Sequence, residues 1–190
     1  MKMKQIFYAL VISFFAADAN AQNAFPAGYT KATVTLYNGN VLQGYVKDNI
    51  KKLSSVTYVD DAGNNKKVYE GSDINALTLD SLHFICVRGD FFKVICAGRL
   101  NFLQKSSNSS GKPTYNGTEA IFNNGTEGKV GDYYFYSDQK LQLLSKKNME
   151  MCINTDFAGC QEAMQLAKAS NGDMAKLGAA VETYNNYAVK

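Results

Sequence analysis

Residues 32–47 read ATVTLYNGNVLQGYVK, and this stretch is the clearest indication of the fold class of the chain. Apolar and polar side chains alternate from Ala32 to Tyr37, which is the pattern of a strand with one buried face. The Asn38-Gly39-Asn40 segment then supplies residues that tolerate positive φ angles, and a second strand follows from Val41 to Lys47. The stretch therefore predicts an antiparallel β-hairpin.

The same rhythm of short strands and turns continues to about residue 145. Further strands are predicted at residues 55–59, 66–70, 74–79, 83–87, 91–96, 100–105, 133–136 and 141–144. Short strands at this density are typical of a small rolled barrel or a sandwich. We therefore predict a mainly β domain over residues 31–145, in which antiparallel sheets share a core.

The segment 106–129 interrupts this pattern because it is rich in Ser, Asn, Gly and Thr. Such a composition predicts a flexible loop, or a hairpin that protrudes from the domain.

The spacing of apolar residues changes after residue 145, where two stripes fit helices. They consist of Phe157, Cys160, Met164 and Ala167, and of Met174, Leu177, Val181 and Tyr184. Gly172 and Asp173 lie between the stripes and are expected to end the first helix and cap the second. We predict a short C-terminal helical tail over residues 146–190 that docks on the β domain, with a partner-binding helical hairpin as the alternative.

Residues 1–21 have the three parts of an export signal. A basic start precedes an apolar run over residues 6–17, and Ala19-Asn20-Ala21 follows as a small-residue cleavage site. The apolar run is too short for a bilayer, which needs about 20 residues. We expect a mature exported protein with an N-terminal extension over residues 22–30 and no transmembrane segment. The periplasm is the expected location, with the cell surface or the medium as the alternative.

The chain contains four cysteines, and export makes disulfides possible. Cys86 and Cys96 fall in predicted strands whose register holds them too far apart for a bond, so we interpret both as small buried apolar residues. Cys152 and Cys160 would lie about 12 Å apart on one unbroken helix, which is also too far. A break near Asn154-Thr155-Asp156 would permit a Cys152–Cys160 disulfide, but we favour buried free thiols for both residues.

The composition argues against several classes of site. The chain has one His, no Trp and a formal net charge of +3. A single imidazole excludes metal sites that need two or three, and the small charge does not indicate nucleic-acid binding. His83 is the one candidate general base of the usual kind, but it falls in an apolar predicted strand, and neither a G-x-S-x-G motif nor a phosphate-binding glycine loop is present. We predict no catalytic residue, cofactor or metal, with an enzyme of unrecognised type as an alternative.

The chain is unusually rich in aromatic residues, with 12 Tyr and 11 Phe. Residues 133–136 read YYFY and place aromatic side chains on both faces of one strand, so Tyr133, Tyr134 and Tyr136 are candidate binding residues. The alternative is a strand that is covered on both sides.

Residues 88–90 read RGD, the tripeptide that integrins bind, and this sequence is also an ordinary hairpin turn. Arg88 and Asp90 are therefore further candidates for a binding surface.

Several motifs give the chain a resemblance to a known group of proteins. They are Gly28-Tyr29, the Thr33-to-Tyr45 hairpin, Val56-Thr57-Tyr58, Phe92-Lys93-Val94 running into Gly98-Arg99-Leu100, Tyr133-Tyr134, Leu144-x-Lys146-Lys147-Asn148 and Val181-x-x-Tyr184-Asn185. In these motifs the chain resembles uncharacterised exported proteins of Bacteroidetes-type Gram-negative bacteria. It departs from that group in Cys86, in Cys96 and in the 106–129 segment.

The resemblance implies a β-rich domain with a short helical tail in the cell envelope, and it brings no assigned activity. Bacteria of this type also attach O-glycans at Asp-Ser/Thr-apolar triplets, so the Asp80-Ser81-Leu82 triplet implies a possible O-glycan at Ser81.

Together these observations predict an exported, non-enzymatic binding or scaffold protein of the cell envelope. The expected partner is an envelope protein or a glycan, and nucleic acid is not expected. The alternative is a surface or secreted factor that contacts host cells or glycans through Arg88-Gly89-Asp90 or through residues 106–129.

Overall fold

The structure is a computed structural model, and it describes residues 27–111, 113–116, 119–122 and 125–187. Ten strands form one antiparallel sheet in the order β12-β11-β8-β7-β6-β5-β1-β2-β3-β4. Their bounds are β1 (Tyr29–Leu36), β2 (Val41–Asp48), β3 (Ser55–Val59), β4 (Lys67–Glu70), β5 (Ile74–Leu79), β6 (Leu82–Val87), β7 (Asp90–Cys96), β8 (Asn101–Lys105), β11 (Tyr133–Ser137) and β12 (Lys140–Leu143). The mainly β prediction is confirmed, and all the strands predicted within residues 31–145 are present.

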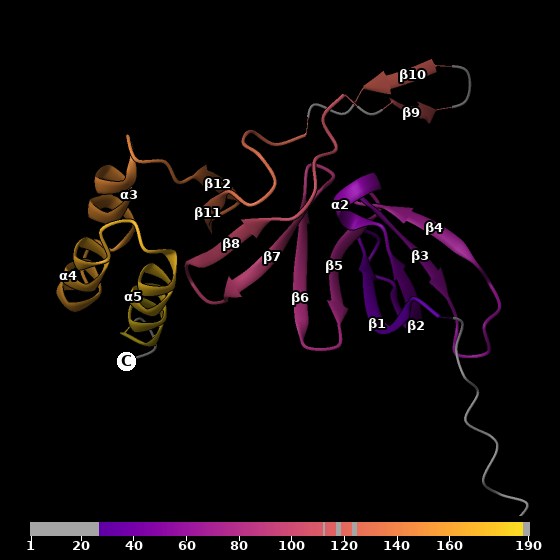
Figure 1. Ribbon diagram of the computed structural model, residues 1–190, viewed down its shortest axis with the longest axis horizontal. Coiled ribbons are helices and arrows are strands. Elements are labelled where there is room, and N and C mark those ends of the chain that lie inside the picture. The colour runs from indigo at the N-terminus through magenta and orange to yellow at the C-terminus, as the bar shows by residue number, and fades with distance from the viewer. Residues whose placement is uncertain (1–26, 112, 117–118, 123–124, 188–190) are drawn as a thin grey trace, which may run out of the picture.

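The sheet curls at its N-terminal end, and it is open because β4 and β12 are its two edges (Figure 1). One buried cluster joins side chains from β1 to β7, including Val34, Tyr69 and Phe91. Strands at opposite ends of this part of the sheet share one core only because the sheet twists and curls. Gly44 assists the curl, since a Cβ atom at this position would collide with the carbonyl oxygen of Val59. The rolled form is therefore reached without closure into a barrel.

Three helices form the C-terminal tail, where the sequence pattern predicts two. They are α3 (Met149–Asp156), α4 (Gln161–Ala169) and α5 (Met174–Tyr187). The first predicted stripe is interrupted, because α3 ends at Asp156 and both Phe157 and Cys160 lie between α3 and α4. The expected cap of α5 is present, since the Asp173 carboxylate accepts the backbone N–H of Ala175 at 2.9 Å.

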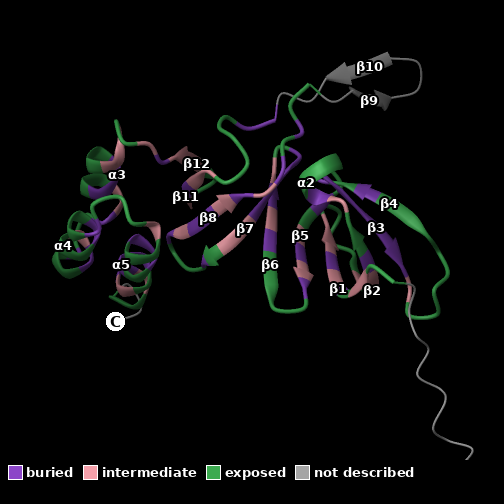
Figure 2. Ribbon diagram, viewed as in Figure 1, coloured by how far each residue is buried: buried purple, intermediate pink, exposed green. Residues whose placement is uncertain are grey.

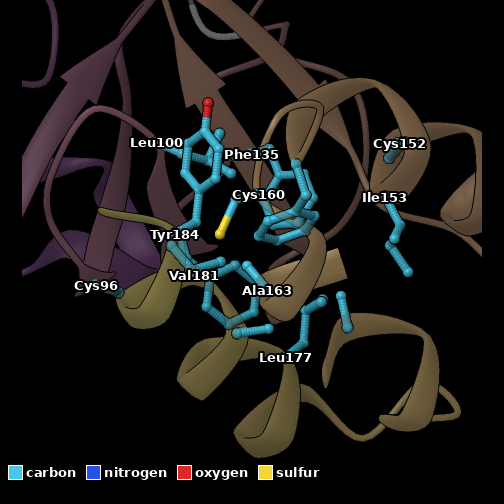
Figure 3. Close-up of a cluster of buried hydrophobic side chains, with 14 of the residues drawn as sticks. Cys96, Leu100, Phe135, Cys152, Ile153, Cys160, Ala163, Leu177, Val181 and Tyr184 are labelled. Carbon is cyan, nitrogen blue, oxygen red and sulfur yellow. The ribbon is translucent and has the colours of Figure 1, made fainter. Parts of the chain in front are cut away.

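The tail packs on one face of the sheet at its C-terminal end (Figure 3). Phe102 of β8 and Phe135 of β11 lie in one buried cluster with Phe157, Leu177 and Val181. Each of these five side chains is at most 1% exposed, whereas the outer faces of the helices are exposed (Figure 2). The helices therefore supply the apolar cover that this half of the sheet needs.

Asn185 near the end of α5 joins the tail to the turn between β7 and β8. Its side-chain oxygen accepts the N–H of Leu100 and its Nδ2 donates to the carbonyl of Leu100, both at 2.9 Å. The guanidinium of Arg99 lies 5.7 Å from the ring centroid of Tyr184, within range of a cation–π contact. Two motifs that are 85 residues apart in the sequence thus meet in the fold.

A short helix and a second, two-stranded sheet complete the described residues. The helix α2 (Ile50–Leu53) lies between β2 and β3, and the sequence pattern does not predict it. The strands β9 (Pro113–Asn116) and β10 (Glu119–Phe122) pair only with each other, so the 106–129 segment contains a hairpin, the second of the two forms expected for it.

The predicted export signal over residues 1–21 lies outside the described residues, as do residues 22–26 of the N-terminal extension. Residues 29 and 30 already belong to β1. In the part of the chain that the structure describes, no helix is long and apolar enough to cross a membrane.

Candidate ligand-binding site

A buried ion pair joins the start of β7 to the end of β8. The Lys105 Nζ lies 3.1 Å from Asp90 Oδ2, and neither side chain has exposed surface. The ammonium also donates to the carbonyl oxygens of Thr126, Glu127 and Gly128, at 2.7, 3.2 and 3.3 Å. The pair therefore anchors the chain that returns from the β9–β10 hairpin.

The carboxylate of Asp90 is surrounded by donors. The Thr126 N–H and hydroxyl donate to Oδ2 at 2.8 and 2.6 Å, and the Ser109 N–H donates to Oδ1. Burial alone would raise the pKa of Asp90, but the bonds from Thr126, Ser109 and Lys105 outweigh it and hold this pKa below its ordinary value of 3.8. Asp90 is thus an ionised structural residue that fastens both ends of the 106–129 segment.

This arrangement corrects the prediction that Asp90 belongs to a binding surface. Arg88 and Gly89 are the two central residues of a β6–β7 turn in which both have positive φ, 50° and 82°, as in a type I′ turn. Asp90 follows as the first residue of β7, and its carboxylate points inward to the bonds described above. A side chain at Gly71 would collide with the carbonyl of Gly89, so the turn is also packed from one side. Arg88 is the exposed residue of the tripeptide.

The aromatic strand β11 does not present three exposed tyrosines. Tyr134 is 1% exposed, its hydroxyl donates to the carbonyl of Glu127 and its ring meets Phe92 edge-on with centroids 5.1 Å apart. Tyr133 is half-buried and stacks on Phe102, and Tyr136 is also half-buried. The strand is therefore mostly a core element that contributes a buried ring to a neighbouring pocket.

That pocket, which we call the hairpin pocket, has a volume of about 410 Å³. Its apolar lining comes from Val87, Tyr134, Leu141 and Leu143, and its polar lining from Arg88, Thr126, Glu127, Asp138, Gln139 and Lys140. This volume lies within the range of small-molecule sites. The structure thus brings two of the predicted binding residues, Arg88 and Tyr134, to one pocket.

Two tight turns carry the polar groups of the hairpin pocket. Asp138 and Gln139 have φ angles of 46° and 61° and connect β11 to β12 as a second type I′ turn. Arg88 lies in the first such turn. Strand pairing on either side defines the backbone of both turns, so the Cα atoms that carry the Arg88 and Asp138 side chains have fixed positions.

The sequence pattern does not identify Lys105, Asp138, Gln139 or Lys140 as residues of this region. A local signal exists for Lys105, because it shares a strand face with Leu103 and so places a cation on an apolar face. The β11–β12 turn carries no signal for a pocket, since its position next to Arg88 depends on sheet order.

The other candidates lie elsewhere. Ser81, the predicted O-glycan site, is exposed in the turn between β5 and β6. His83 is exposed on β6, and its Nδ1 lies 3.2 Å from Thr78 Oγ1. Among the described residues, no group of three His, Cys, Asp or Glu side chains is placed to hold a metal ion.

The four cysteines are free and buried, as the preferred interpretation expects, and the possible Cys152–Cys160 bridge is not formed. The helix does break between them, but Cys152 stays in α3, where Gln142 Nε2 donates to its sulfur at 2.9 Å, while Cys160 directly precedes α4. Burial raises the pKa of Cys152 and Cys96, and that of Cys86 more strongly.

No family model, curated protein or solved structure matches this chain.

Proposed function

We propose that this chain is an exported, non-enzymatic binding protein of the cell envelope, and that the hairpin pocket holds a glycan. The observation that carries the proposal is the lining of the pocket, where an apolar wall faces charged and amide side chains on two rigid turns. Export is supported by the signal-like residues 1–21 and by the resemblance to exported envelope proteins.

The lining of the hairpin pocket suits the two sides of a sugar ring. The C–H face of a pyranose can pack on Val87 of β6 and on Leu141 and Leu143 of β12. The hydroxyl groups on the ring edge need donors and acceptors, which Arg88 and Asp138 offer. A few placed polar groups around an apolar wall are typical of selective small-molecule sites.

Two observations favour this function over the alternatives. Integrin-type recognition needs the carboxylate of the Arg-Gly-Asp tripeptide, and Asp90 has no exposed surface. A catalytic His83 would need an orienting carboxylate as well as a nucleophile; its Nδ1 lies 3.2 Å from the hydroxyl of Thr78, but among the described residues it forms no ion pair with a carboxylate. Neither alternative therefore gains support from the arrangement of its own candidate residues.

The test is a glycan-binding screen of the mature chain, followed by calorimetry on the strongest hit. Arg88→Asn and Asp138→Asn each remove a charge from the pocket, and Asn tolerates the positive φ at both positions. We expect each to weaken binding about tenfold, the effect of losing one charge-assisted hydrogen bond of roughly 1.5 kcal/mol. The matched control is Asp61→Asn, an exposed turn residue outside the pocket. Failure to bind any glycan, or an equal loss in the control, contradicts the proposal.

Location is tested separately by fractionation of the native cells, with mass spectrometry of the N-terminus. Protein that begins at Gln22 and fractionates with the periplasm or the outer membrane supports the envelope proposal. Protein that retains residues 1–21 in the cytoplasm contradicts it.

A further inference from the structure

A second pocket opens in the helical tail, between α3 and the turn that joins α4 to α5. We call it the helix cleft; its volume is about 710 Å³. Its apolar lining is Leu144, Met149, Ile153, Ala167 and Met174, and its polar lining is Ser145, Lys146, Glu150, Lys168, Ser170, Asn171 and Gly172. No residue of the hairpin pocket contributes to it. We propose that the helix cleft binds a long-chain carboxylate, with its hydrocarbon chain inside and its head group at Lys146 and Lys168.

The interior of the cleft suits an unbranched hydrocarbon chain. Ile153 and Ala167 at the back are 4% and 1% exposed, so the cleft reaches the buried core of the tail. Met149 and Met174 are half-buried and pack against that core. Methionine side chains are flexible and polarisable, and they adapt to the shape of an apolar ligand.

The rim carries the charge that a carboxylate requires. Lys146 precedes α3 and Lys168 lies in the last turn of α4, so cations come from both sides of the opening, and both side chains are exposed. Glu150 is the acidic residue of the lining, which leaves the rim with a net positive charge. A single anionic head group complements this rim, whereas a cationic one would be repelled.

Hydrogen bonds fix both walls, so the cleft exists before a ligand arrives. On the α3 side, Asn148 Oδ1 accepts the Ser145 N–H at 2.7 Å and Asn148 Nδ2 donates to the carbonyl of Leu143 at 2.7 Å. On the other side, the hydroxyl of Ser170 donates to the carbonyl of Ala167 at 2.7 Å, and the N–H of Asp173 donates to the carbonyl of Ser170. A preformed site avoids the ordering cost that weakens binding.

The methionines make the test specific to the cleft. Apart from Met1 and Met3, all the methionines of the chain lie in the tail, at positions 149, 151, 164 and 174. Met149 and Met174 line the cleft, whereas Met151 is 60% exposed outside it and Met164 does not line it. We would label the methionine methyl groups with ¹³C in the mature chain and titrate laurate below its micelle concentration. The expected result is a saturable shift of the Met149 and Met174 signals, with Met151 and Met164 unchanged.

Charge variants and a cationic analogue test the head-group assignment. Lys146→Glu and Lys168→Glu should each weaken laurate binding about fivefold, the size of one exposed ion pair of roughly 1 kcal/mol. Lys147→Glu is the matched control, because Lys147 is exposed in the same segment but does not line the cleft. Dodecyltrimethylammonium, which has the same chain and the opposite charge, should bind more weakly than laurate.

Three outcomes would overturn the proposal. They are unchanged Met149 and Met174 signals at saturating laurate, equal affinity for the two head groups, and an equal loss in Lys147→Glu. Methyl signals that respond to an amphipathic helical peptide and not to laurate would assign the cleft to a protein partner and would likewise overturn it.

Discussion

Replacing Lys105 by methionine keeps the length of the side chain and removes the ammonium that contacts Asp90 Oδ2 at 3.1 Å and the Thr126 carbonyl at 2.7 Å. Since neither charged side chain has exposed surface, water does not replace the ammonium. Removing one partner of a buried ion pair costs about 3–5 kcal/mol, because the other charge stays buried. We expect the Lys105→Met variant to lose about this much free energy of unfolding.

Urea denaturation followed by far-ultraviolet circular dichroism measures the loss. With a denaturant slope of about 2 kcal/mol per molar, the midpoint should fall by roughly 2 M. Lys47→Met is the matched control, because Lys47 is an exposed strand lysine of β2, and its change should stay within about 0.5 kcal/mol.

A loss below about 1 kcal/mol in Lys105→Met would refute the reasoning. Such a result would mean that the Asp90 carboxylate is solvated or neutralised in the variant, and that the pair does not anchor the returning segment at Thr126.

Three further predictions concern pH, the thiols and Asn185. The pKa of Asp90 is lowered on folding, so its stabilising effect is complete above its unfolded pKa of about 3.8 and is lost as the pH falls through the lower folded value. The free energy of unfolding, measured at a series of acidic pH values, should show this loss in the unsubstituted protein and lack it in Asp90→Asn. The buried thiols of Cys86, Cys96, Cys152 and Cys160 should react with a thiol reagent only after the protein is unfolded in urea. Rapid reaction of any of them in the folded protein would contradict their burial. Asn185→Leu leaves the N–H and C=O of Leu100 without this partner and should cost about 2 kcal/mol in urea denaturation, whereas Asn186→Leu, one residue along α5, should cost less.

The strands were predictable because their signals are local. The stretches 55–59 and 74–79 match β3 and β5 at both ends, since alternation and turn residues depend only on near neighbours. The helical tail was less predictable. Phe157 and Cys160 carry a helical spacing, yet they lie between two helices, because burial in the tail core gives the same pattern as a continuous helix face.

The candidate site was predictable only in part. Arg88 was identified from its turn, and the structure brings it to the same pocket as Tyr134. The inward direction of Asp90 depends on donors from Ser109 and Thr126, which are 19 and 36 residues away in the sequence. Such contacts leave no periodic signal.

Local sequence patterns account for the short antiparallel strands, their turns and the apolar stripes of the tail, and the composition accounts for the scarcity of catalytic groups. Each of these follows from side-chain chemistry over a few consecutive residues. The three-dimensional fold was needed to show that the sheet curls without closing, that Asp90 is buried against Lys105, and that two turns meet at the hairpin pocket. These features arise from strand order and from long-range burial, where the free energy depends on which distant segments exclude water together.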